Sequence, residues 1–168
     1  MALKTRQVLD LFKVRVDSAV SNEWKTHSTL RHSPNPDEIT NDYRVTDPNL
    51  GKILKAILIM PAEARIKRGT TGRNGFSMRV RNIRIQAFIG IDINKSAGAP
   101  DRVLEDAIDD IVVELQKLNR MEEKSQGDTF HLGEMIVSPI TSAEVSNHSV
   151  LVQEILTVVQ DRILGRED

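Results

Sequence analysis

The sequence predicts an α+β fold in which a single mixed or antiparallel β-sheet is packed by two amphipathic helices. Two patterns carry this prediction. Apolar residues recur at spacings of three and four near the N-terminus and again after residue 100, as in helices with one buried face. Apolar and polar residues alternate between residues 83 and 93, as in a strand with one apolar face. A length of 168 residues suits one domain spanning residues 1–168.

Each predicted helix has a continuous apolar stripe. The first helix is expected from about Thr5, its N-cap, to Trp24. The second is expected from Asp101 to Asn119, and the carboxylate of Asp101 suits the free amides and the dipole of the first turn. The stripes consist of Val8, Phe12, Val16, Ala19 and Val20 in the first helix and Leu104, Ala107, Ile108, Ile111, Leu115 and Leu118 in the second.

The alternating strand, Ile83–Ile93, is the clearest strand signal in the chain. Upstream of it, Met78 and Val80 are out of phase with the isoleucines. A β-bulge near Arg81 or Asn82 would bring them into phase, so we expect one there.

Three further strands are expected. Ile53–Met60 is an isoleucine-rich run that ends before Pro61, and Glu134–Ile140 and Val150–Val159 follow the second helix. Residues 120–133 are expected to form a loop, and residues 142–149 a connection. Both faces of the last strand are apolar, so we expect a helix on each face, or a helix on one face and a neighbouring subunit on the other.

Two polar segments interrupt these elements. Residues 25–51 contain three prolines and many Asn and Asp residues, which predicts a long polar arm, either extended or partly disordered. Residues 64–77 contain glycines among Thr, Arg and Asn, which predicts a flexible basic hairpin tip between two strands.

The charges are sorted along the chain. Residues 64–91 contain no Asp or Glu, whereas the outer face of the second predicted helix is acidic, although the net charge is only −1. A cationic strand segment can be a solvated sheet edge, a contact to a nucleic-acid backbone, or a docking surface for the acidic face of an identical neighbour. The predicted contact residues are Arg65, Lys67, Arg68, Arg73, Arg79, Arg81 and Arg84 on the basic side and Glu105, Asp106, Asp109, Asp110 and Glu114 on the acidic side.

Catalytic motifs are weak throughout the sequence. His27 and His32 lie five residues apart in a loop, without the helical spacing of a zinc pair, and the glycines of residues 69–75 lack the Gly-Lys-Ser/Thr ending of a phosphate loop. We therefore predict a protein that is not an enzyme and binds no metal or cofactor. A metal-dependent hydrolase built on Asp92, Glu105 and Asp109 is the catalytic alternative.

The composition of the chain excludes several classes of site and of partner. The chain has no cysteine, which excludes disulfides and thiolate metal sites. No apolar run approaches the ~20 residues that span a bilayer, and the N-terminus lacks the apolar core of a signal peptide. We expect no membrane partner.

Three segments together resemble the tail terminator proteins of long-tailed bacteriophages. They are the opening helix Thr5–Phe12, the strand and helix of Ile83–Ile93 and Val103–Leu115, and the closing strand Ser149–Val159. The resemblance is a pattern over most of the chain rather than a signature motif, and it carries no catalytic residues.

The resemblance implies a structural protein of the virion tail or neck, assembled in the host cytoplasm. It implies a homo-oligomeric ring, a hexamer in this family, that caps the tail tube, stops tube polymerisation and joins the tube to the head-side connector protein. Its partners would be further copies of itself, the tail tube protein, the connector and DNA passing through the lumen. The alternatives are another head–tail connector subunit, or a nucleic-acid-binding module that uses the segment Arg65–Arg84.

Overall fold

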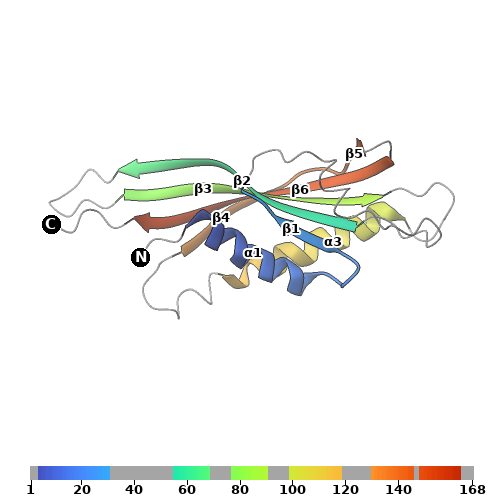
Figure 1. The fold of residues 1–168 in the computed structure, drawn as a ribbon, viewed down its shortest axis with the longest axis horizontal. Coiled ribbons are helices and arrows are strands. Elements are labelled where there is room, and N and C mark those ends of the chain that lie inside the picture. The colour runs from blue at the N-terminus through green and yellow to red at the C-terminus, as the bar shows by residue number, and fades with distance from the viewer. Residues whose placement is uncertain are drawn as a thin grey trace.

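The computed structural model describes residues 4–30, 55–68, 77–90, 99–118, 130–145 and 148–163. Six strands form one mixed sheet, and both helices lie against the same face of it (Figure 1). This confirms the α+β class. The elements in chain order are α1 (Thr5–Ala19), β1 (Lys25–Ser28), β2 (Lys55–Arg68), β3 (Ser77–Gly90), α3 (Pro100–Leu115), β4 (Phe130–Val137), β5 (Thr141–Val145) and β6 (His148–Ile163).

The sheet has the strand order β1-β2-β3-β6-β4, and β5 also pairs with β6. β1 and β2 are parallel, and the other pairs are antiparallel. β6 pairs with β3 along almost its whole length, while its other edge is shared by β5 and β4. Between those two strands Ser138 continues the pairing, because its N–H donates to the Glu154 carbonyl at 2.9 Å and its hydroxyl accepts from the Glu154 N–H at 2.9 Å.

The main core lies between the helices and one face of the sheet. Alternate residues of β3 and β6 point to this side, and they pack against the apolar stripes of α1 and α3. Burial of these aliphatic side chains, at about 25 cal/mol per Å² of apolar surface, is the main term that holds helices to sheet. Members of this core include Val8, Phe12 and Val16 of α1, Leu104, Ile108 and Ile111 of α3, and Ile83, Ile85, Ile155 and Val159 of the sheet.

Both helices are predicted from the sequence, but their observed bounds differ from the predicted ones. α1 ends at Ala19 rather than near Trp24, since Val20 is already in extended backbone conformation, and its N-cap is Lys4 rather than Thr5. α3 begins at Pro100, a position where the missing N–H of proline costs nothing. Asp101 lies in its first turn, as expected.

The strand predicted to end before Pro61 continues to Arg68, which corrects that boundary. A proline is tolerated where its nitrogen faces an open sheet edge, and β1 pairs with β2 only as far as Ile59. The register between β2 and β3 shifts between Pro61 and Ala64, so the bulge lies in β2 and not near Arg81 or Asn82. β3 pairs with β6 without interruption.

Both predicted polar segments include residues that belong to strands. The arm of residues 25–51 begins with a strand, because Lys25–Ser28 pairs with β2, and residues 31–51 lie outside the described residues. The predicted hairpin tip of residues 64–77 begins and ends in the sheet, since residues 64–68 belong to β2 and Ser77 to β3. Residues 69–76 lie outside the described residues.

The C-terminal part is more regular than the sequence indicated. The predicted loop at 120–133 contains the start of β4 at Phe130, and the predicted connection at 142–149 contains all of β5 except its first residue, Thr141. β6 extends beyond the predicted 150–159 at both ends. Both described helices lie on one side of the sheet, and α3 is the one that packs on β6, so a helix on each face of β6 is excluded within these residues. On the other face Val150 and Val152 are buried with Phe88 and Ala143.

Candidate assembly surfaces

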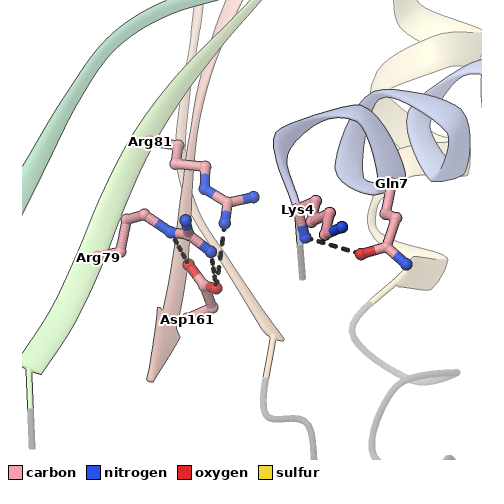
Figure 2. A network of polar contacts seen from close by, with 5 residues as sticks. All are labelled: Lys4, Gln7, Arg79, Arg81 and Asp161. Carbon is pink, nitrogen blue, oxygen red and sulfur yellow. Dashed lines mark hydrogen bonds and ion pairs between the residues drawn. The ribbon is translucent and has the colours of Figure 1, made fainter. Parts of the chain in front are cut away.

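Arg79 and Arg81, which belong to the basic segment of residues 64–91, both contact the carboxylate of Asp161 inside the subunit (Figure 2). Arg79 holds Asp161 with two hydrogen bonds, from Nε to Oδ1 at 3.2 Å and from Nη2 to Oδ2 at 2.8 Å. Arg81 Nη2 donates to the same Oδ2 at 3.3 Å. The Arg81 side chain is only 2% exposed. Arg81 is therefore withdrawn from the predicted contact surface, and Arg79 is largely committed within the fold.

The position of this cluster follows from the uninterrupted pairing of β3 with β6. Because β3 has no bulge, Arg79 and Arg81 continue the face of Ile83, which is the helix-facing side of the sheet. Asp161 lies directly opposite Arg79 on β6. Buried charges persist in folded proteins when they are paired and hydrogen-bonded, as these are. No local sequence pattern indicates this partner, because Asp161 lies 82 residues from Arg79.

Two further arginines have carboxylate partners on the opposite face. Arg84 Nε lies 3.9 Å from Glu154 Oε2, and both side chains are about one third exposed. Gln86 donates to the other oxygen of Glu154. Arg65 lies 3.7 Å from Glu63, with both side chains about three quarters exposed, and a pair so exposed contributes little stability.

The exposed cations that remain on the described part of this segment are Arg65 and Lys67 of β2. Arg73 and the side chain of Arg68 lie outside the described residues. The register with β3 places Arg65 and Lys67 on the sheet face that points away from the helices, opposite Val80 and Met78. They lie at the end of β2, beyond the part of the sheet that α3 covers (Figure 1).

The acidic helix face is formed as predicted at four of its five positions. Glu105, Asp106, Asp109 and Asp110 are all exposed, and none of them makes an ion pair with another described residue. We call these four residues the α3 acidic row. Val113, which follows Asp109 by four positions, is 62% exposed on the same side of the helix.

Glu114, the fifth predicted residue, does not belong to this row. Its carboxylate accepts from Arg15 of α1 at 3.3 Å and from Lys117 at 2.7 Å, so it joins the two helices. The hydrogen bond from Lys117 and, to a smaller degree, the interaction with Arg15 hold the pKa of Glu114 below its ordinary value of 4.5, against the opposing effect of burial. Glu114 is thus a structural contact within the subunit.

Of the residues considered for metal chemistry, His27, Glu105 and Asp109 lie within the described ranges. Within the described ranges, no group of three or more His, Asp or Glu side chains could hold a metal ion. His27 lies on β1 and the acidic row lies on α3, while Asp92 and His32 are outside the described residues. Within the same ranges, no helix has the length and apolar character to cross a membrane.

Comparison with known proteins adds no family assignment. No protein-family model matches the chain, and no curated protein matches it.

Proposed function

We propose that this chain is a structural subunit of a bacteriophage tail or neck. Copies of it form a ring that caps the tail tube, stops tube polymerisation and joins the tube to the head-side connector. The α3 acidic row and the exposed cations of β2 are the surfaces that contact other proteins of the assembly, and the chain has no catalytic role.

The observation that carries the proposal is the α3 acidic row. Glu105 and Asp109, and likewise Asp106 and Asp110, are spaced by four residues, so like charges face each other on consecutive turns. Each such pair costs an isolated helix about 0.2–0.5 kcal/mol. A partner with cationic groups would convert this repulsion into attraction. The exposed Val113 within the same surface provides apolar area that such a partner would cover.

The separation of the two charged surfaces supports assembly with other molecules rather than internal pairing. Arg65 and Lys67 point away from the helices, whereas the acidic row is on the helix layer. Because the surfaces cannot meet within one subunit, they remain available to other chains. Contacts between different surfaces of identical subunits are head-to-tail, and these close into rings when the rotation permits.

The test uses tail tubes assembled from the tube protein of the same genome. With wild-type protein, we expect electron microscopy to show a ring at the tube end and tubes of limited length. Asp109→Lys should abolish capping while the subunit stays folded. The matched control is Asp10→Lys, which reverses an exposed carboxylate on α1 and should leave capping intact. Tubes that stay bare and continue to grow with wild-type protein would contradict the proposal.

Nucleic-acid binding through Arg65–Arg84 is the second candidate. Arg79, Arg81 and Arg84 all have carboxylate partners in the fold, which reduces the cations available for phosphates. This candidate predicts binding of duplex DNA, with an association constant whose logarithm falls linearly with the logarithm of the salt concentration. Loss of that binding in an Arg65→Ala/Lys67→Ala variant would favour it.

A further inference from the structure

Within the described ranges, two strand edges at the same end of the sheet are open. β1 pairs with β2 only up to Ile59, so the second half of β2 has no neighbour on that side among the described residues. Among the strands that the structure describes, β4 is the outermost on the other side. The two open edges are level with each other, because a line across the sheet joins Ile66 to Arg79, Asp161 and Phe130. An open edge is a template for pairing with another chain.

We propose that neighbouring copies of this chain pair the open edge of β2 with the open edge of β4, so that one sheet continues from subunit to subunit. The inference rests on the proposed ring and names the contact that builds it. The strand directions permit it. β2 and β6 run one way and β3 and β4 the other. Copies related by rotation about an axis along the strands would therefore place β2 antiparallel to the next β4.

The hydrogen-bonding groups of β2 point the right way. The Ile59 carbonyl accepts from the Thr29 N–H at 3.0 Å, so Ile59 directs its polar groups to the β1 side. In an antiparallel ladder this direction alternates along the strand. β3 pairs with β6 without interruption, so Ile85, Arg81 and Arg79 all direct their polar groups to the β6 side. Their partners on β2 are Ile59, Ala64 and Ile66, which therefore all direct their polar groups away from β3. Ala64 and Ile66 thus offer their N–H and C=O groups to the open edge.

The same argument applies to β4. Glu154 exchanges hydrogen bonds with Ser138 on the β4 side, so alternate residues of β6 bond to that side. Met135 and Val137 lie opposite the other residues of β6. Their N–H and C=O groups therefore point outward.

Both edges also present the same face. Ile66 lies on the helix side of β2, and Leu132 and Met135 pack against the core on the helix side of β4. Directly opposed residues of an antiparallel pair have their side chains on one side of the sheet. Pairing β2 with the next β4 therefore keeps the helices of both copies on the same face, as a rotational ring requires.

Charge and exposed apolar surface favour the pairing of β2 with β4 over the pairing of β2 with a second β2. Arg65 and Lys67 would oppose themselves in a β2–β2 pair, whereas Glu134 of β4 offers an opposite charge. Ile66 on β2 is 64% exposed, and Ile136 and Val137 on β4 are 54% and 43% exposed. Apolar residues at open edges promote association. In this arrangement the α3 acidic row stays on the other face of the sheet from Arg65 and Lys67, free for the tube or the connector.

Disulfide cross-linking tests the pairing, because the chain has no cysteine of its own. Ile66→Cys would be combined with Leu132→Cys, Met135→Cys or Val137→Cys in turn, since opposed residues of a hydrogen-bonded antiparallel pair lie at a Cα distance of about 5.5 Å, which a disulfide can bridge. Oxidation of concentrated and of tube-bound protein should give a ladder of covalent oligomers for at least one pair. Ile66→Cys with Val113→Cys is the matched exposed control and should give no ladder.

Each outcome decides the inference. No ladder with any of the three pairs, in either preparation, overturns it, and so does a covalent dimer from Ile66→Cys or Val137→Cys alone, because that indicates like-to-like pairing. Capped tubes without a ladder would overturn the edge pairing and leave the proposed function standing. A ladder with bare tubes would do the reverse.

A proline variant gives a second measurement. Ile66→Pro removes an N–H that points to the open edge and leaves the β2–β3 ladder intact, as Pro61 already does in this strand. We expect Ile66→Pro to be a folded monomer by circular dichroism and light scattering, whereas Ile66→Val should assemble normally. Normal assembly of Ile66→Pro would contradict the edge pairing.

Discussion

The basic strand β3 and the acidic helix α3 have opposite charge patterns in the sequence, and the fold treats them differently. The arginines of β3 each find a carboxylate on β6, so most of this charge is neutralised inside the subunit. The α3 acidic row finds no partner among the described residues. Only the second region therefore has charge to offer to another molecule, and the contribution of a charged segment to assembly depends on what lies opposite it in the sheet.

The largest expected effect comes from removing the carboxylate that Arg79 and Arg81 share. Asp161→Ala leaves Arg81 charged at a site where its side chain is 2% exposed. Breaking a buried ion pair in this way costs about 3–5 kcal/mol. Urea unfolding should show a loss of that size, and a loss below ~1 kcal/mol would show that the cluster is not a structural contact.

A smaller effect is expected from Glu154, the partly exposed partner of Arg84 on the sheet face that points away from the helices. Glu154→Gln removes the charge that pairs with Arg84, and both side chains are about one third exposed. Ion pairs near the surface contribute about 0.2–1 kcal/mol, so the free energy of unfolding should decrease by an amount in that range. Arg84→Gln in the same background should then add almost nothing, as a double-mutant cycle would show.

The pairing of Glu114 should appear as a pH dependence of stability. Its pKa is lowered in the folded protein by the hydrogen bond from Lys117 and the interaction with Arg15. This contribution is therefore complete above the ordinary value of 4.5 and is lost as the pH falls through the lower folded-state pKa. Glu114→Gln should reduce the loss of stability on acidification in that window, measured by thermal unfolding. An unchanged profile would contradict the role assigned to Glu114.

The smallest expected effect on stability is on α3, and it has the opposite sign. Asp109→Asn removes repulsion with Glu105 and should stabilise the isolated subunit by about 0.2–0.5 kcal/mol. The same change should weaken assembly, measured as a higher protein concentration needed to cap tubes. A variant that is both destabilised and fully active would show that the row serves the fold rather than a partner.

Much of the fold could be predicted from local patterns. The stripes of α1 and α3 and the alternation from Ile83 onward are strong periodic signals, and they place the core on one side of the sheet. The short strands β1 and β5 were missed, because their polar sequences pair only through neighbours that are distant in the sequence or curl back in a hairpin. The sequence predicts a strand end at Pro61, whereas the strand continues, since a proline is tolerated at an open edge that only the topology reveals.

The candidate surfaces were predicted in part. The exposure of Glu105, Asp106, Asp109 and Asp110 follows from their position opposite the leucine stripe of a helix, so periodicity was enough. The burial of Arg81 could not be predicted, because it depends on the absence of a bulge in β3 and on Asp161 arriving beside it from β6. The pairing of Glu114 with Arg15 depends on how the two helices cross.

A map of the assembled particle by electron cryo-microscopy would test the central claim most directly. The α3 acidic row and the cations Arg65 and Lys67 are expected to lie against other protein chains, with the acidic row facing cationic side chains. A ring or neck map in which both surfaces contact only solvent would contradict the account.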